Sequence, residues 1–386
     1  MRSIMHCLVV TTIVGLPGVA RAELIEHIAA SGLGFGYQVL IADMNNDGRP
    51  DLVGLGAQMT ELVWFENPDW ERHVLVSDVT QMISVDAADI DADGIPELAL
   101  AYRFSTRPAN SPGQIAVLRH NGDPTEPWTL TDLDAVPSTH RVRWADIDGS
   151  GVPILVAAPI VNQDAENQTD LAQLPTPLIM FRPGDWEPEL ISDANKGTVH
   201  GLLPWDSDGD GRDEVLTAGR VGIYAHTAAA DGSWRRTELA VGVDQPYPDG
   251  GSSDLAASTL AGRPLLAAIE PFHGNEVVVY RPNASGGYRR LVIDTVLENG
   301  HTIVAADLTG DGNAEIVAAG SRGREVYLYR AGDPAGDTWE RSIIDSDISA
   351  NSCAAADING DGRVDVACID SRQPNNLKWY ENTGNW

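Results

Sequence analysis

Five short acidic segments recur along the chain with a spacing that suits a bound cation. Each has the form Asp-x-(Asp, Asn or Thr)-x-Asp-Gly-x-x-(Asp or Glu), and they begin at Asp43, Asp89, Asp206, Asp307 and Asp357. Side-chain oxygens at positions 1, 3, 5 and 9 and a carbonyl oxygen at position 7 can converge on one hard cation, while glycine at position 6 permits the sharp turn. We therefore expect about five calcium sites per chain.

The expected calcium ligands are the oxygen-bearing side chains at positions 1, 3, 5 and 9. They are Asp43, Asn45, Asp47, Asp51, Asp89, Asp91, Asp93, Glu97, Asp206, Asp208, Asp210, Glu214, Asp307, Thr309, Asp311, Glu315, Asp357, Asn359, Asp361 and Asp365. Two further copies are degenerate: Asp146–Ile154 lacks the last acid and Ser258–Leu266 has none. Calcium with saturated oxygen ligands is expected to stabilise the turn, with a catalytic role as the alternative.

Three histidines occupy one position of the repeat, six residues before the first residue of the segment. His140, His200 and His301 stand there, and the other four repeats have Tyr37, Ile83, Ser252 and Asn351. Imidazoles brought together from different repeats can bind a transition metal or carry out general acid–base catalysis near neutral pH. We take His140, His200 and His301 as catalytic candidates; the alternative is that they hydrogen-bond to neighbouring repeats in a purely structural role.

The elements around these residues predict an all-β, seven-bladed β-propeller. The seven segments start 46 to 60 residues apart, which is a blade-sized period. Each repeat has room for four short β-rich strands, expected in the first repeat at 38–42, 52–55, 62–65 and 72–76. An aromatic residue precedes the fourth strand in six repeats, and packing between blades is favoured over a row of ligand-stacking rings. These residues are Trp70, Trp128, Trp186, Trp234, Tyr288 and Trp339.

The two ends of the repeat array predict how the ring closes. The last repeat stops at Trp386, where the first repeat enters its fourth strand, and the segment 24–29 resembles those fourth strands. We therefore expect the first mature strand to complete the last blade, which removes exposed sheet edges. The expected domains are a signal peptide over 1–22 and a single propeller over 23–386.

The first strand of each blade lines the channel of a propeller, so the three histidines are expected near one mouth, opposite the acidic turns. The loops between the second and third strands share that mouth. They carry basic side chains that we take as ligand-binding candidates for an anion or a sugar: Arg103, Arg220, His273, Arg322 and Arg372, with Arg107 and Arg324 nearby. The segment 161–177 between two such strands is either a lid over the mouth or a mobile insertion.

The net charge and the N-terminal residues limit the possible partners and the cellular compartment of the protein. The formal net charge of −30 disfavours binding to nucleic acid or an anionic membrane. A basic start at Arg2, an apolar stretch over 4–16 and the sequence Ala20-Arg21-Ala22 predict a cleaved export signal, and hence a periplasmic or secreted protein without a membrane span. Cys353 and Cys368 fall on two expected neighbouring strands, where a disulfide and two buried thiols are equally compatible.

The acidic segments and blade period resemble the VCBS/FG-GAP repeat family, whose members are exported or extracellular propellers with calcium in these loops; integrin α-chain heads are distant relatives. The phrases WERHVL, GHTIVAADLTGDGNAEIV and NNLKWYEN are also similar to the propeller part of the aldos-2-ulose dehydratase type, which works on keto-sugars. That resemblance implies chemistry at the histidine-bearing mouth. The cupin-like domains that accompany such propellers are absent from this sequence.

Three functions remain open at the level of sequence. The first is a calcium-binding envelope module that recognises a glycan or a protein through the mouth, and the second is a sugar lyase, dehydratase or isomerase that uses the histidines, with or without a transition metal. The third is a purely structural adhesion element. The chain contains no Gly-x-Ser-x-Gly, P-loop or His-Glu-x-x-His sequence, so hydrolase, nucleotide-binding and zincin functions have no support. We expect a monomer.

Overall fold

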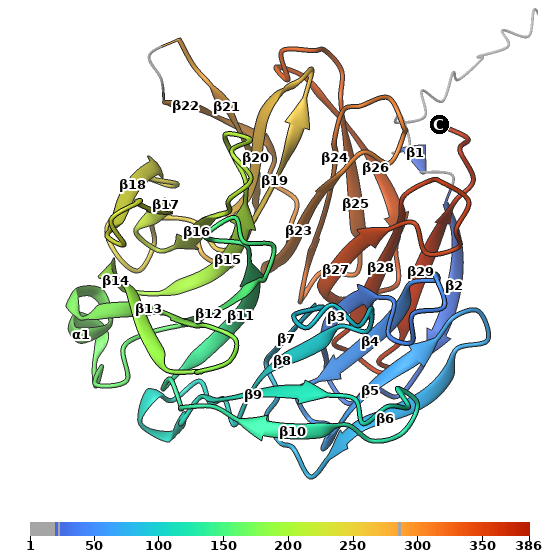
Figure 1. The fold of residues 1–386 in the computed structure, drawn as a ribbon. Coiled ribbons are helices and arrows are strands. Elements are labelled where there is room, and N and C mark those ends of the chain that lie inside the picture. The colour runs from blue at the N-terminus through green and yellow to red at the C-terminus, as the bar shows by residue number, and fades with distance from the viewer. Residues whose placement is uncertain (1–19, 22–23, 285–286) are drawn as a thin grey trace, which may run out of the picture.

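The computed structural model describes residues 20, 21, 24–284 and 287–386, and it is a seven-bladed β-propeller (Figure 1). The expected fold class is therefore confirmed. Nearly all of the expected signal peptide lies outside the described residues. Among the described residues, no helix has the length and apolar character needed to cross a membrane.

The first four blades are antiparallel four-stranded sheets, each formed by four consecutive strands. Their strands are β3 Gly36–Ala42, β4 Asp51–Gly56, β5 Glu61–Glu66, β6 Glu71–Ser77; β7 Ser84–Ala88, β8 Glu97–Tyr102, β9 Gln114–Arg119, β10 Thr129–Asp132; β11 Thr139–Ala145, β12 Ile154–Pro159, β13 Pro175–Phe181, β14 Pro188–Lys196; and β15 Val199–Trp205, β16 Glu214–Gly219, β17 Gly222–Ala228, β18 Trp234–Ala240. The four strands expected in the first repeat are all present.

The last three blades have the same order of pairing. Their strands are β19 Leu255–Leu260, β20 Arg263–Glu270, β21 Glu276–Pro282, β22 Tyr288–Asp294; β23 Gly300–Ala306, β24 Glu315–Gly320, β25 Val326–Ala331, β26 Trp339–Asp345; and β27 Ala350–Ala356, β28 Asp365–Asp370, β29 Leu377–Asn382. The short strand β1, Ala20–Arg21, pairs in parallel with β26. A 3₁₀ turn at Pro108–Asn110 and helix α1, Gln168–Gln173, lie in the loops of blades 2 and 3.

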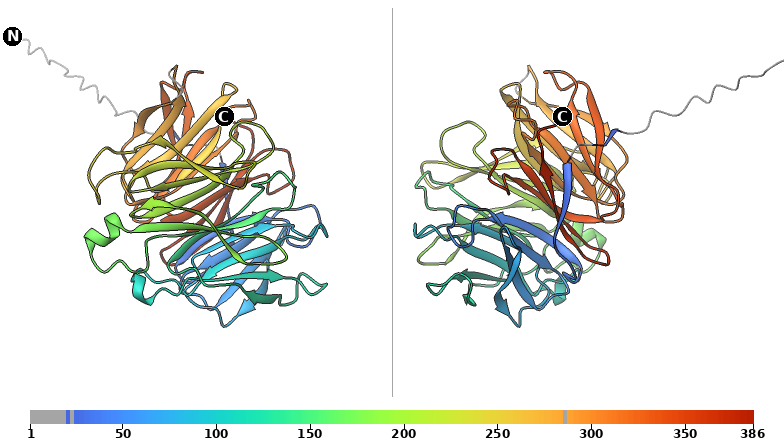
Figure 2. Two further views of the ribbon diagram at one scale, coloured as in Figure 1. Left: turned by 60° about the vertical axis from the view of Figure 1, so that its left-hand side comes forward. Right: turned by 90° about the vertical axis from the view of Figure 1, so that its right-hand side faces the viewer.

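The N-terminal strand β2, Leu24–Ala30, closes the ring as predicted. It pairs antiparallel with β29 as the outer strand of blade 7, with Leu24 opposite Asn382. Figures 1 and 2 show this blue strand running beside the red strands of the last repeat. The first and last segments of the propeller are therefore held in one sheet, which leaves no unpaired edge between them.

Seven buried apolar clusters lie among the described residues, one between each pair of neighbouring blades. Successive side chains of a strand point to opposite faces. On β24, for example, Ile316 packs toward blade 5 and Val317 packs toward blade 7. Because both faces of a middle strand are covered, these strands are continuous apolar runs, and the core is divided among the blades.

The aromatic residues before the fourth strands belong to these clusters, as the packing interpretation requires. Trp128 is buried in the cluster between blades 1 and 2, and Trp339 packs against the one between blades 5 and 6. Trp70 lies 6.1 Å from Trp379 between blades 7 and 1, measured between ring centroids. They stabilise the contacts between blades.

Candidate functional site

Each of the three predicted histidines lies at a β-bulge in the first strand of its blade. The pairing register shifts between Thr139 and Arg141, between Val199 and Gly201, and between Gly300 and Thr302, so His140, His200 and His301 are each the extra residue. Similar shifts enclose Tyr37 and Asn351. A β-bulge redirects the side chain of the inserted residue and is frequent beside active sites. These bulges aim the side chains into the mouth of the channel.

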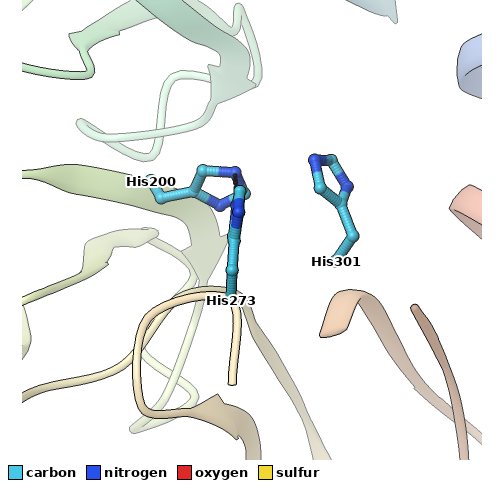
Figure 3. Close-up of side chains that lie close together, drawn as sticks. All are labelled: His200, His273 and His301. Carbon is cyan, nitrogen blue, oxygen red and sulfur yellow. Dashed lines mark hydrogen bonds between the residues drawn. The ribbon is translucent and has the colours of Figure 1, made fainter. Parts of the chain in front are cut away.

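Four imidazoles meet there. The ring centroids of His140 and His200 lie 4.6 Å apart, and His301 lies 5.2 Å from His200 and 5.1 Å from His273. His273 comes from the loop between β20 and β21, and its Nε2 is 3.1 Å from the Nε2 of His200 (Figure 3). We call His140, His200, His273 and His301 the histidine cluster. His273, expected only as a ligand-binding residue of the rim, is thus part of the cluster itself.

Hydrogen bonds fix how two members of the cluster present their nitrogens. The Nδ1 of His301 is 2.7 Å from the carbonyl oxygen of Asn351, so Nδ1 carries the hydrogen and donates it. In the neutral ring, Nε2 then offers a lone pair toward the cluster. The hydroxyl of Tyr37 lies 2.8 Å from the Nε2 of His140 and 3.5 Å from the Nε2 of His301. Tyr37 therefore connects two imidazoles.

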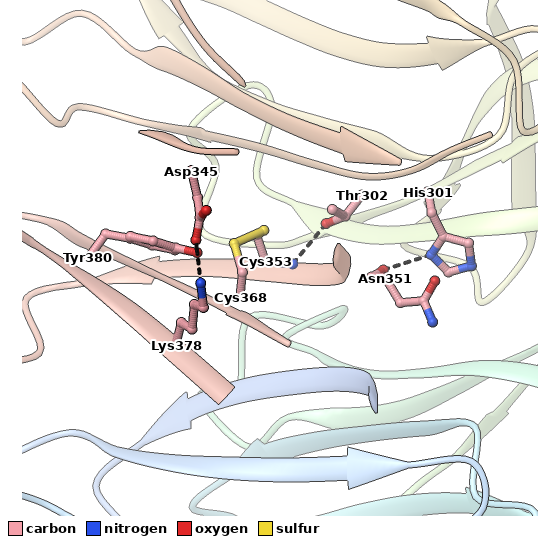
Figure 4. Close-up of a disulfide and its surroundings, with 8 residues drawn as sticks. All are labelled: His301, Thr302, Asp345, Asn351, Cys353, Cys368, Lys378 and Tyr380. Carbon is pink, nitrogen blue, oxygen red and sulfur yellow. Dashed lines mark hydrogen bonds and ion pairs between the residues drawn. A yellow bond between two sulfur atoms is a disulfide. The ribbon is translucent and has the colours of Figure 1, made fainter. Parts of the chain in front are cut away.

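A disulfide lies in the strand pair that carries Asn351. Cys353 and Cys368 face each other on β27 and β28 and are bridged (Figure 4). The N–H of Cys353 donates to Oγ1 of Thr302, 3.0 Å away on β23. The disulfide fixes β27 to β28, and the hydrogen bond holds β27 against β23 and thereby keeps the Asn351 carbonyl beside His301.

Burial keeps the histidine cluster neutral. His140, His200 and His301 are at most 5% exposed. Desolvation holds the pKa of His140 and of His200 well below the usual value, and it lowers the pKa of His273 to about 4 and that of His301 to about 3. The positive charge of Arg141 acts in the same direction on all four. Each ring is thus unprotonated at neutral pH and able to accept a proton or bind a metal.

The geometry of three of these imidazoles fits a transition metal. One nitrogen each from His200, His273 and His301 lies within 4.8 Å of the others. The 3.1 Å between the Nε2 atoms of His200 and His273 is close to the ~3.3 Å edge of a tetrahedron with metal–nitrogen bonds of 2.0–2.1 Å. His140 is adjacent but is not in this group, so the metal-compatible trio differs by one residue from the expected trio.

The cluster forms the floor of a cavity of about 590 Å³ at the mouth. Three of the expected ligand-binding residues line it: His273, Arg322 and Arg372. The guanidinium of Arg372 donates to the carbonyl of Arg322 at 2.8 Å, which joins two loops of the rim. Arg220 lines an adjoining groove, whereas Arg103 is exposed and does not line the cavity. The segment 161–177, suggested as a lid, forms the walls of two neighbouring grooves, with α1 inside it.

Buried charges lie in the channel beneath the cluster. Arg141, Arg143 and Asp254 line a space of about 250 Å³ there. Asp86 accepts a hydrogen bond from the N–H of Trp144 at 2.8 Å. Burial raises the pKa of Asp86 and of Asp254, and the arginines oppose that rise. The positive and negative side chains compensate one another, as burial requires.

The acidic turns lie at the opposite end of the first strands. In the first of them the carboxylate of Asp43 accepts the N–H groups of Asp47 and Gly48, at 3.1 and 2.8 Å. The last acid, Asp51, is fully buried and accepts N–H groups of Met44 and Asn67. Backbone hydrogen bonds to the first and last acids thus shape the turn.

In each of two acidic turns, three carboxylates lie close together. One oxygen each from Asp89, Asp91 and Glu97 lies within 4.8 Å of the others, and the same holds for Asp206, Asp208 and Asp210. Calcium–oxygen bonds of 2.3–2.6 Å place ligand oxygens up to about 5 Å apart, so these groups have a suitable size. The acids at position 5 also make ion pairs: Asp93 with His120 at 2.8 Å and Asp210 with Arg212 at 2.6 Å.

Comparison with known proteins places this geometry in a family context. Residues 37–100 and 307–368 match the FG-GAP-like repeat, and residues 112–283 match the β-propeller domain of aldos-2-ulose dehydratase. The propeller is thus similar to FG-GAP-like repeats over these two segments and to that domain over its middle part. The dehydratase-type segment contains His140, His200 and His273.

One curated relative and two solved structures are similar to this chain. Aldos-2-ulose dehydratase of Phanerodontia chrysosporium is 24% identical over 334 residues, which are 76% of this chain and 36% of that protein. A structure of BBS1N in complex with ARL6DN superposes with a TM-score of 0.61 at 14% identity, covering 95% of this chain and 99% of that one. A lectin of Agrocybe aegerita has a TM-score of 0.52 at 15% identity, covering 89% and 85%. These two structures share the fold.

Proposed function

We propose that the histidine cluster is the active site of a sugar-processing propeller of the lyase or dehydratase class. The observation that carries the proposal is the convergence of four neutral imidazoles on one cavity, in a propeller similar to that of aldos-2-ulose dehydratase. The cavity of about 590 Å³ is in the size range of small-molecule sites, and the two arginines of its rim can donate hydrogen bonds to sugar oxygens.

The chemistry proposed is elimination of water from a keto-sugar. A neutral imidazole removes the proton on the carbon next to the carbonyl, the carbon–oxygen bond at the following carbon breaks, and a carbon–carbon double bond forms. The hydroxyl leaves as water after it takes a proton from an imidazolium or from the hydroxyl of Tyr37. His301 suits the role of base, because its Nδ1 is held by Asn351 and its Nε2 faces the cluster.

A bound transition metal would move the role of base from His301 to His140, because the Nε2 of His301 would then be a metal ligand and its Nδ1 is bonded to Asn351. His200, His273 and His301 would hold it, since one nitrogen from each lies within 4.8 Å of the others. When bound, it would act as a Lewis acid on a sugar oxygen. His140 and Tyr37 would remain free to orient the sugar and move protons.

The test is turnover of a panel of keto-hexoses, followed by the ultraviolet absorbance of the enone product. We expect the wild-type chain to form enone and His301→Gln to lower kcat by about 10²–10⁴-fold, because one general base is removed. His27→Gln, at a half-buried histidine of β2 that does not line the cavity, is the matched control and should retain full activity. Thermal melting of each variant separates lost chemistry from lost folding. No enone from any sugar of the panel would contradict the proposal.

A glycan-binding module without turnover is the second candidate. It is favoured by the likeness in fold to the Agrocybe aegerita lectin, a protein with specific recognition of non-reducing terminal N-acetylglucosamine. Saturation-transfer NMR distinguishes the two: a sugar that binds in the cavity and is recovered unchanged supports the module. The same experiment with envelope glycoproteins extends the search to a protein-borne glycan.

We also propose that the five acidic turns bind calcium and that the protein is exported to the periplasm or the medium. The two carboxylate groups of suitable size support calcium. Export is supported by the Cys353–Cys368 disulfide, because disulfides persist in oxidising compartments. Fusion of residues 1–22 to a reporter enzyme that is active only outside the cytoplasm tests export.

A further inference from the structure

A second hollow at the mouth continues outward from the histidine cavity. It measures about 820 Å³, and Phe104, Thr106 and Ile160 line both spaces, so the two are contiguous. One wall is helix α1 of the blade 3 insertion, and another is the segment Tyr247–Asp249 between β18 and β19. Phe272 lines this hollow and stacks on His273 of the histidine cavity, with 4.4 Å between the ring centroids. We call this hollow the outer groove.

Arg220 and two aromatic rings form one side of the outer groove. The guanidinium carbon of Arg220 is 4.0 Å from the ring centroid of Phe272 and 5.4 Å from that of Tyr247. The guanidinium also donates to the carbonyl of Pro248. Its Nε is buried and has no hydrogen-bond partner among the described residues. The two rings and the contact with the Pro248 carbonyl hold Arg220 in place, and its Nε–H group remains available as a hydrogen-bond donor to a ligand.

The other side of the outer groove carries short polar side chains. Gln168, Thr169 and Gln173 of α1 line it, and Thr198 lies beside them with its hydroxyl 3.4 Å from that of Tyr247. Amides and hydroxyls both donate and accept hydrogen bonds. The faces of Phe272 are covered by Arg220 and His273, but Tyr247 and Phe104 also line the groove. Aromatic rings beside such polar groups suit a pyranose, which has apolar C–H faces and a rim of hydroxyls. Arg220 and Asp249 have opposite charges, so the lining side chains favour a neutral ligand.

We propose that the outer groove is a second sugar subsite, which holds the next unit of a neutral oligosaccharide whose terminal unit occupies the histidine cavity. This rests on the proposed function, because the terminal unit is placed at the histidine cluster. The natural ligand is accordingly a chain of at least two sugars, or the end of a longer glycan. Phe104, Thr106 and Ile160 line both spaces and so lie along the path from one subsite to the other.

Chain-length dependence of affinity tests the subsite. Calorimetry would compare mono-, di- and trisaccharides built from glucose, mannose or N-acetylglucosamine on the wild type, on Tyr247→Ala and on Tyr224→Ala. Tyr224 is a half-buried tyrosine of β17 that does not line the groove, so it is the matched control. We expect at least one trisaccharide to bind about 10-fold more tightly than its monosaccharide, a stacking and hydrogen-bond gain of about 1.4 kcal/mol. This ratio should fall below about 3-fold in Tyr247→Ala and persist in Tyr224→Ala.

The outcomes separate this proposal from the one it rests on. If monosaccharides bind and added units bring no gain, the subsite is wrong and the histidine cavity stands. If the gain is the same in Tyr247→Ala as in the wild type, the added units lie elsewhere and the subsite is also wrong. If no saccharide of either length binds, the subsite is wrong, and the turnover of keto-hexoses decides separately whether the proposed function stands. The subsite proposal would also be overturned if a peptide bound in the outer groove and no saccharide displaced it.

Discussion

Several histidine side chains of this protein are buried in the neutral form. The four members of the histidine cluster and His226 on β17 all have a lowered pKa, and desolvation is the main cause in each. In the mouth this neutrality leaves lone pairs available for a proton or a metal. His226 is fully buried between strands, so its neutral ring contacts no ligand. Its burial instead lowers the stability of the fold at acidic pH.

His226 should make the propeller less stable as the pH falls. Its folded pKa is about 4 against an ordinary value of 6.5, so below pH 6.5 the unfolded chain takes up a proton that the folded chain does not. Stability is therefore lost as the pH falls from 6.5 to about 4, by up to about 3 kcal/mol. Urea unfolding of His226→Gln between pH 7 and 4.5 should show a smaller loss than the wild type. An equal loss in both proteins would contradict the lowered pKa of His226, and His27→Gln, at a half-buried histidine of β2, is the control.

The repeat position alone was enough to predict that His140, His200 and His301 share one mouth. It did not predict the bulges that aim them, because a one-residue shift in pairing depends on the partner strand. His273 was expected only on the rim, since loop residues carry no repeat register, although its neighbour Phe272 and the tight Pro271–Gly274 turn mark an ordered loop. Arg141, one residue after His140, gave no signal of its own that it lies beneath the cluster.

At the scale of elements, the last blade depends on contacts between segments distant in the chain. Its outer strand comes from the N-terminus, and buried polar bonds add to the sheet: Asp345 of blade 6 accepts from Lys378 and Tyr380 of β29, at 2.8 and 2.7 Å (Figure 4). The disulfide lies in the same blade. Closure and the histidine cavity are linked there, because β27 carries both Cys353 and Asn351.

Removal of the disulfide should destabilise the chain. The bridged cysteines are 15 residues apart, and a cross-link of that span stabilises a protein by about 3 kcal/mol, mainly by restricting the unfolded chain. The double variant Cys353→Ala/Cys368→Ala should unfold at lower urea concentration by that amount, and dithiothreitol should affect the wild type but not the variant. Identical transitions for wild type and variant without reductant would show that the thiols are not bridged in solution.

The strands themselves were largely predictable, because the apolar runs flanked by acidic turns have a fixed order in every repeat. The closing strand β2 was also found from the sequence, since it matches the fourth strands elsewhere. Helix α1 was not: its six residues, Gln168–Gln173, are too few for a helical period, and the Asn167 side chain that caps them sits in a polar segment. That insertion nevertheless forms a wall of the outer groove.

At the scale of the whole molecule, the two ends of the propeller have different chemistry. One end gathers the acidic turns, and the other gathers imidazoles and arginines in a chain whose formal net charge is −30. The first strand of each blade joins the two ends. Our central proposal is that calcium at the acidic end stabilises the blades and that the histidine mouth at the other end binds and acts on a sugar.

Metal content of the purified chain tests this claim most directly. Elemental analysis would compare the wild type with His200→Gln/His301→Gln and with Asp206→Asn/Asp208→Asn. We predict about five calcium ions and one transition metal per wild-type chain, loss of the transition metal alone in the histidine variant, and loss of about one calcium alone in the aspartate variant. A wild-type chain with no bound calcium, or a transition metal that persists in the histidine variant, would contradict the account.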